Sequence, residues 1–212
     1  MNEQEQPIER HTEGPSSGTL APETHEAEPR DGPRIYVASL SDYNAGLLHG
    51  QWIEAVDDAE TMQDEIDSML QTSPTTARYG EIAEEWAIHD YEGFGQLRLD
   101  ENEALSTVAK LAAGINSHGL AFAAWVARVD ERSDDLIEQF EDRYQGQWES
   151  VESYAEHLLE ELDAERIVTE APEWLQPYLK LDVAGFARDL EIGGDITTAE
   201  TTEGGVWVWS GW

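Results

Sequence analysis

Rows of carboxylates at helical spacing are the feature of this sequence with the clearest chemical meaning. Segment 150–165 repeats apolar residues at i, i+3, i+4 and i+7, which predicts a helix with one buried face. Seven acids in or just before it place about one carboxylate per 3–4 Å of helix axis, close to the ~3.4 Å charge spacing of one DNA strand. These acids are Glu149, Glu152, Glu156, Glu160, Glu161, Asp163 and Glu165.

The same pattern recurs in two other predicted helices, at 58–70 and 133–144. The first carries Asp58, Glu60, Asp64, Glu65 and Asp67, and the second carries Asp134, Asp135, Glu138, Glu141 and Asp142. Acids four residues apart repel each other by a few tenths of a kcal/mol, so a helix selected for stability alone would intersperse lysines. The rows therefore favour a surface that presents negative charge to a partner. Solvated helix faces, adaptation to high salt and cation binding are alternatives, although no segment has the EF-hand spacing.

Four residues suggest a different chemistry. His49, His89, Asp90 and Glu92 lie on candidate strands of one predicted sheet, where they could form an acid–base or metal cluster. The alternative is that the imidazoles are hydrogen-bonded residues of a sheet face or edge. The chain has no cysteine and no P-loop, HExxH, G-x-S-x-G or G-x-G-x-x-G motif. We therefore expect no catalytic residue, cofactor or metal site.

Composition limits the partners of the chain. Its 212 residues include 46 acids and 12 basic residues, for a formal net charge of −34. Direct binding to nucleic acid or to an anionic membrane would need a basic footprint, which this composition excludes. Residues 1–33 hold eight of the acids and two arginines, a net of −6, so residues 34–212 carry the remaining −28. Most of the charge belongs to the part of the chain that is expected to fold.

The predicted fold class is α+β, in an elongated chain of three small domains. Residues 1–33 are rich in Pro, Gly, Glu, Ser and Thr, which predicts a disordered acidic tail. We expect an N-terminal α+β domain over 34–97, with strands and one helix, and a helical middle domain over 98–144. A C-terminal α+β domain follows over 145–212. Each unit has little core of its own, so dimerisation is plausible.

Several local signals set the expected boundaries. Residues 42–46 (DYNAG) indicate a turn, and Asp100 with Glu103 indicates the start of a helix that Gly114 and Asn116 would end. Ser133 and Asp182 are expected to cap later helices, and 195–209 to form a hairpin. Among the tryptophans, Trp52, Trp86 and Trp125 are expected in the core, whereas Trp207 and Trp209 share a strand face that suits either a core or an interface.

Long strings in a fixed order make the chain similar to a known family. They are 34–38 (RIYVA), 42–46 (DYNAG), 48–53 (LHGQWI), 84–94 (EEWAIHDYEGF), and, late in the chain, Tyr178 and 186–190 (FARDL). On these residues the chain resembles the ArdA antirestriction proteins of plasmids, transposons and phages. The tail and the segment 201–212 depart from the family pattern.

The resemblance implies a function that composition alone does not show. Family members are elongated three-domain dimers whose acidic surface imitates bent B-form DNA. They occupy the DNA-binding groove of type I restriction–modification enzymes, chiefly the specificity and methyltransferase subunits, by competition and without catalysis. The resemblance thus implies a cytoplasmic bacterial protein that binds that enzyme and does not bind nucleic acid or membrane. From the rows themselves, we expect the binding carboxylates to be the acids named above apart from Glu65, sixteen in all. The alternative is an acidic protein-interaction or halophilic adaptor protein without DNA mimicry.

Overall fold

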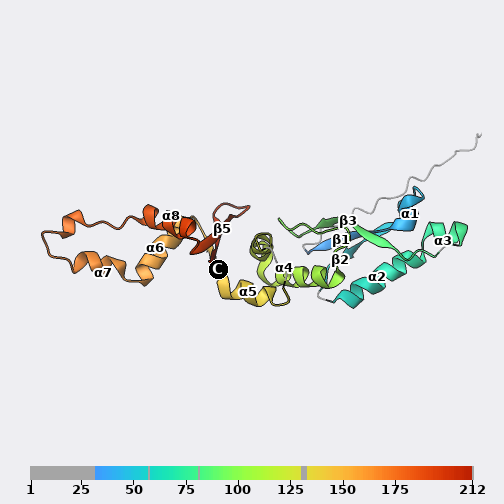
Figure 1. Cartoon of the computed structure of the whole chain (residues 1–212), viewed down its shortest axis with the longest axis horizontal. Helices are drawn as coiled ribbons and strands as arrows, with labels where there is room; N and C mark the ends of the chain where they lie inside the picture. Colours follow the sequence, from blue (N-terminus) through green and yellow to red (C-terminus); the bar gives the residue numbers. More distant parts are fainter. Residues whose placement is uncertain (1–31, 57, 81, 130–132, 212) are drawn as a thin grey trace, which may run out of the picture. The chain divides into compact units, whose positions relative to one another are not determined.

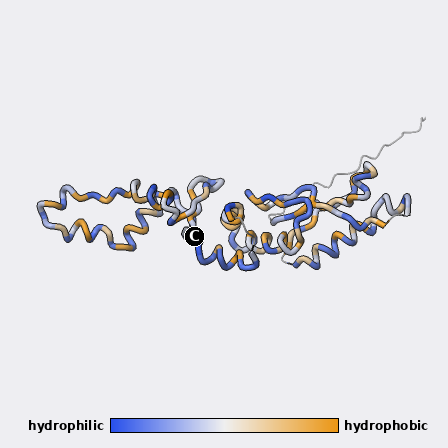
Figure 2. Tube along the Cα trace, viewed as in Figure 1, coloured by the Kyte–Doolittle hydropathy of each residue, from blue (hydrophilic) through white to orange (hydrophobic). Residues whose placement is uncertain are grey.

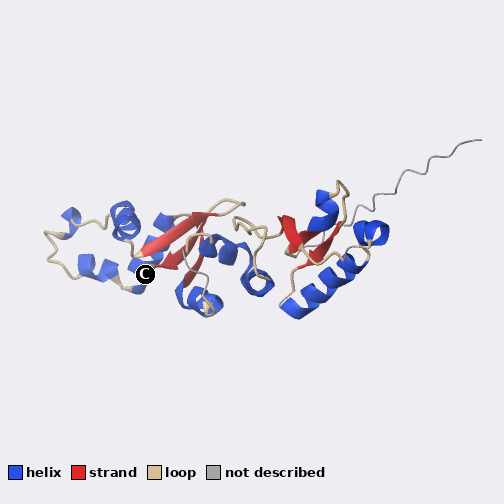
Figure 3. Cartoon of the chain, turned by 45° about the vertical axis from the view of Figure 1, so that its right-hand side comes forward, coloured by secondary structure: helices blue, strands red, loops and turns tan. Residues whose placement is uncertain are grey.

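The computed structural model of the chain describes residues 32–56, 58–80, 82–129 and 133–211 (Figure 1). The predicted tail, apart from its last two residues, lies outside these ranges. In chain order the elements are β1 (Arg34–Ser39), α1 (Leu40–Asn44), β2 (Gly50–Glu54), α2 (Ala59–Gln71), α3 (Pro74–Tyr79), β3 (Trp86–Glu92), α4 (Leu105–Val126), α5 (Leu136–Arg143), β4 (Tyr144–Trp148), α6 (Val151–Glu161), α7 (Ala164–Thr169), η1 (Gln176–Tyr178), α8 (Val183–Gly193), β5 (Ile196–Glu200) and β6 (Val206–Ser210). The chain is thus a mixture of helices and two small antiparallel sheets, which Figure 3 shows as separate groups of strands.

The first sheet confirms the predicted sheet with a helix laid on it. Its strand order is β2-β1-β3, and Ile35 of β1 pairs with Ile53 of β2. Alternate residues of these strands point into the core, as the period of two requires. Helix α2 contacts β2, and its Met62 and Ile66 are fully buried in the same core cluster.

A buried carboxylate joins α1 to α3. The residues 42–46 were predicted to form a turn, but Asp42 lies inside α1 and is fully buried. The backbone N–H of Thr75, in the first turn of α3, donates to Asp42 Oδ1 at 2.8 Å. Burial alone would raise the pKa of Asp42, but the hydroxyls of Thr75, Ser39 and Ser73, with the Thr75 N–H, outweigh it and hold this pKa well below its usual range.

Helix α4 passes through the residues that were predicted to end it. The predicted helix end at Gly114 was wrong. This glycine lies inside α4, where the absence of a side chain makes room for the Phe122 ring, since a Cβ there would lie 2.2 Å from that ring. The break comes instead at Gly119, whose φ of 66° and ψ of −157° are accessible almost only to glycine. The two helical segments joined at Gly119 therefore turn so that the Phe122 ring packs against Gly114.

Two of the three predicted helix caps in this part of the chain were wrong. The N-cap of α4 is Ala104, without a side-chain hydrogen bond, so Asp100 and Glu103 do not cap it. The N-cap of α5 is Asp135, whereas Ser133 accepts a hydrogen bond from the Gln139 side chain at 3.0 Å. The cap of α8 is Asp182, as predicted, and its carboxylate accepts from the Gly185 N–H at 3.0 Å.

The second sheet has the order β4-β6-β5. It confirms the predicted hairpin of β5 and β6 and adds β4, a strand that the sequence analysis missed. Since β6 is the central strand, its aromatic residues do not lie on an open edge. Trp207 and Trp209 are buried in the larger core cluster, and Val208, on the opposite face, is buried in a smaller cluster with Tyr154 and Ile196.

Aromatic rings link the helices to this second sheet. Phe140 of α5 is fully buried, with ring centroids 5.5 Å from Phe122, 5.8 Å from Trp125 and 4.8 Å from Tyr144. Trp125 was correctly predicted in the core. Trp52, in contrast, is 36% exposed on the first sheet, where the Arg34 guanidinium lies over its ring.

Within the described residues, no helix combines the length and the hydrophobicity that a membrane span requires.

Replacing the buried carboxylate tests its role. We expect Asp42→Asn to lower the free energy of unfolding at neutral pH by about 2 kcal/mol, because a charged acceptor of buried donors is lost. The lowered pKa stabilises the fold above the ordinary aspartate pKa of about 3.9, and this contribution is lost as the pH falls further. In urea unfolding, the difference in free energy of unfolding between Asp42→Asn and the unchanged protein should therefore become smaller below about pH 4. The exposed Asp64→Asn is the control, and an equal effect of both variants would contradict this role.

Candidate partner-binding surface

The first acidic row lies on the solvent side of α2. The N-cap carboxylate of Asp58 accepts from the N–H of Glu60 at 3.0 Å and from the Thr61 hydroxyl at 2.6 Å. The Thr61 hydroxyl and then the Glu60 N–H lower the pKa of Asp58, which favours its charged form. The buried face of α2 holds Met62, Ile66, Met69 and Leu70. The predicted acids Asp58, Glu60, Asp64 and Asp67 are all exposed.

The second row lies on and just before α5. Leu136 and Phe140 are buried, so the acids are left on the outside of the helix. The Ser133 side chain is the main cause of a lowered pKa at Asp135, to which Gln139 also donates at 2.8 Å. All five predicted acids of this row are exposed: Asp134, Asp135, Glu138, Glu141 and Asp142.

The third row is divided between two helices. A capping box of Ser150 and Ser153 starts α6, whose Tyr154 and Ala155 are buried. The predicted helix 150–165 is wrong in one respect, because it breaks at Asp163, a non-glycine residue with a φ of 51°. Leu162 belongs to the apolar repeat of that predicted helix and was therefore expected on its buried face, but it is 72% exposed. All seven predicted acids are exposed, from Glu149, Glu152, Glu156, Glu160 and Glu161 on or before α6 to Asp163 and Glu165 around the start of α7.

Few cations accompany these sixteen acids. In the described residues, the pairs that involve them are Asp134 with Lys110, Glu141 with His118 at 3.1 Å, and Glu161 with His157 at 3.5 Å. Figure 2 shows hydrophilic and hydrophobic residues interleaved along α2 and α6, as expected when one face packs and the other meets solvent. The rows therefore present carboxylates that a basic partner can reach.

The acid–base hypothesis places four residues at one site, but the structure separates them. The strand β1 lies between β2 and β3. His49, which precedes β2, is therefore at the opposite edge of the sheet from His89, Asp90 and Glu92 on β3. His49 Nε2 hydrogen-bonds to the Met69 carbonyl at 2.8 Å, and Glu92 accepts from Arg34. No group of three or more His, Asp or Glu residues in the described ranges is placed to hold a metal ion.

A second exposed feature was not expected from the sequence. Large apolar side chains remain uncovered in the segment from α7 to the end of α8. They include Ile167, Trp174, Tyr178 and Ile192, each more than 70% exposed. Their spacing follows no single period, because α7, η1 and α8 are separated by loops, and so no sequence pattern marked them.

Fold and surface together define an acidic α+β protein whose helices present carboxylates on their outer faces. The family described as "Antirestriction protein (ArdA)" matches residues 35–204, which is 170 of the 212 residues. The chain therefore belongs to the ArdA family of antirestriction proteins, as its resemblance predicted. The match leaves out the tail and most of the segment 201–212. A comparison with curated proteins found no match.

Repulsion within the third row is expected to lower the stability of the fold. Glu156 lies four residues from both Glu152 and Glu160. We expect Glu156→Gln to raise the free energy of unfolding by a few tenths of a kcal/mol, because two repulsive pairs are removed. Glu161→Gln is the control, since Glu161 faces His157 and should give no such gain. Urea unfolding at low salt measures both, and a destabilised Glu156→Gln would contradict the arrangement.

Proposed function

We propose that this protein is a DNA mimic that blocks type I restriction–modification enzymes by occupying their DNA-binding groove. Three exposed rows of carboxylates on α2, α5 and α6–α7, with few cations beside them, are the observation that supports the proposal. Family membership supports an antirestriction function and an interaction with restriction–modification enzymes. The further step to mimicry rests on the charge.

The charge density suits such a groove. Residues 34–212 carry a net charge of −28, which corresponds to roughly 48 Å of duplex at ~1.7 Å per charge. Acids at i and i+4 stand about 6 Å apart along a helix axis. A groove that holds DNA through lysine and arginine would meet carboxylates at comparable density, and attraction between opposite charges would speed the encounter. The proposed contacts are with the specificity and methyltransferase subunits, and no catalytic step is needed.

We also propose that the chain folds into three domains, at 34–97, 98–144 and 145–212, and that the active form is a homodimer. The first range contains the sheet of β1 to β3, the second contains α4 and α5, and the third contains most of the other sheet with α6 to α8. The uncovered Trp174 and Tyr178 support an interface in the third range, because exposed aromatic residues are enriched where proteins associate.

Salt tests the electrostatic mechanism. We expect the affinity for a purified type I methyltransferase to fall at least about tenfold between about 50 and 200 mM salt, because ions held in the groove are released on binding. Titration of labelled protein at several salt concentrations measures this. An affinity that does not change with salt would contradict mimicry.

Plating of phage tests the function in cells. Expression should raise the plating efficiency of unmodified phage on a host with a type I restriction system. We expect Glu160→Gln alone to keep nearly full activity, because the charge is distributed over many residues. A variant with four acids neutralised on each of the three rows should lose it. Loss of activity from the single change would indicate a localised site instead.

A further inference from the structure

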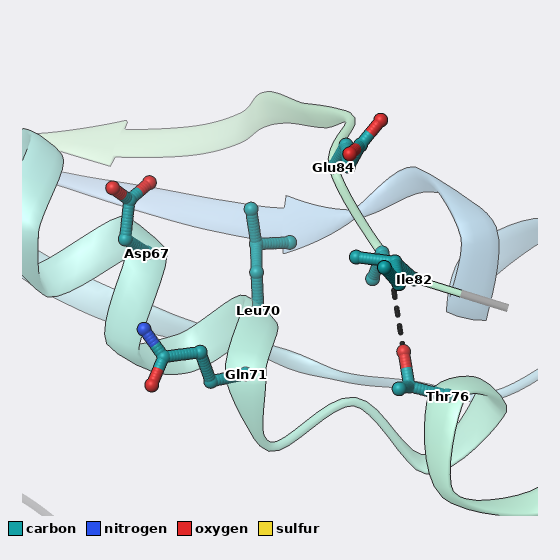
Figure 4. A pocket seen from close by; sticks show the side chains of 7 residues that line it. Asp67, Leu70, Gln71, Thr76, Ile82 and Glu84 are labelled. Carbon is teal, nitrogen blue, oxygen red and sulfur yellow. Dashed lines mark hydrogen bonds between the residues drawn. The ribbon is translucent and has the colours of Figure 1, made fainter. Parts of the chain in front are cut away.

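A cavity of about 540 Å³ lies beside the end of α2, where Asp67 of the first acidic row meets apolar residues. We call it the α2–α3 pocket. Figure 4 shows that Asp67 and Leu70 come from α2, Thr76 from α3, and Ile82 and Glu84 from the segment that leads to β3. Leu70 stands between the side chains of Asp67 and Ile82 in this view.

One side of the pocket is apolar, whereas Gln71 and Thr76 are among its polar lining residues. Leu70 and Ala83 are 6% and 7% exposed, so they form a floor that belongs to the core. Ile82 forms a wall and is 77% exposed. The Ala83 N–H donates to Thr76 Oγ1 at 3.2 Å, which ties this segment to α3 and holds the wall in place. An aliphatic side chain so exposed gains free energy when another apolar group covers it.

Carboxylates lie beside this apolar side of the pocket. Asp67 and Glu84 both line the pocket, and the described lining residues include no lysine or arginine. The Asp67 carboxylate accepts from the neutral Gln63 amide at 2.8 Å. The nearby Arg78 of α3 is directed to the Tyr79 ring, at 6.0 Å from its centroid. The pocket thus combines an apolar wall with negative charge.

A lysine or arginine side chain has both matching parts, a methylene stem that prefers apolar surface and a cationic head. A purely apolar group would bring the two carboxylates out of water without a partner, which is costly. We propose that the α2–α3 pocket receives one lysine or arginine side chain from the basic groove of the target enzyme. This inference rests on the proposed function and adds to it an apolar contact, whose strength changes much less with salt than that of an ion pair.

The experiment measures binding of the full chain to a purified type I methyltransferase across a range of salt concentrations. Ile82→Ser removes the wall at an exposed position, and Leu48→Ser is the matched control, since Leu48 is 93% exposed and does not line the pocket. We expect Ile82→Ser to weaken binding about fivefold at every salt concentration, because the stem loses its apolar contact. Leu48→Ser should bind like the unchanged protein.

Glu84→Gln tests the charged part of the same pocket. It should weaken binding at low salt and reduce the slope of log affinity against log salt by about one. In the double variant with Ile82→Ser and Glu84→Gln, the fold loss of affinity should be smaller than the product of the two single fold losses, because both residues contact one side chain. If thermal melting shows that Ile82→Ser is unfolded, Glu84→Gln alone serves as the test of the pocket.

Two failures are distinguishable. If the unchanged protein binds with a steep salt dependence but Ile82→Ser and Glu84→Gln bind equally well, the pocket is not used and this inference is overturned, while mimicry stands. If the unchanged protein does not bind, or binds without salt dependence, the proposed function fails and the inference fails with it.

Discussion

Burial of one apolar face of each acidic helix is the constraint on which the rest of this structure depends. The carboxylates on the outer faces repel one another and add nothing to packing. Attachment to the core therefore comes from residues such as Met62 and Ile66 in α2, Phe140 in α5 and Tyr154 in α6. Since buried residues of this kind attach the helices to the core, most of the outer acids are not needed for packing, and we propose that they serve recognition.

The central strand β6 connects this packing across the second sheet. Trp207 and Trp209 enter the larger core cluster from one face, and Val208 enters the smaller cluster from the other. One short strand thus supports both α5 and α6, which carry two of the acidic rows. For the proposed DNA mimicry, helices that are already packed on a core before binding would leave little ordering to oppose association.

Periodic patterns were predicted well because they depend on the local chain alone. Helix α2, the strands of the first sheet and the β5–β6 hairpin all follow from spacing of apolar residues and from turn residues. The predictions failed where a distant residue decides the backbone. Gly114 looked like a helix end, but it admits the Phe122 ring, and Asp42 looked like a turn residue, but it accepts from Thr75. No periodic signal marks β4, which has the short sequence YQGQW.

The sequence by itself determined that the charge would lie outside. Sixteen acids predicted from helical spacing are exposed, because a carboxylate without a partner is too costly to bury. The family also followed from residues in order along the chain. Only the tertiary structure decided which residues meet: that His49 and His89 lie at opposite edges of the sheet, and that Ile82, Leu70 and Asp67 line one pocket. Such contacts depend on how separate elements pack against one another, and the residue spacing within one element does not determine that packing.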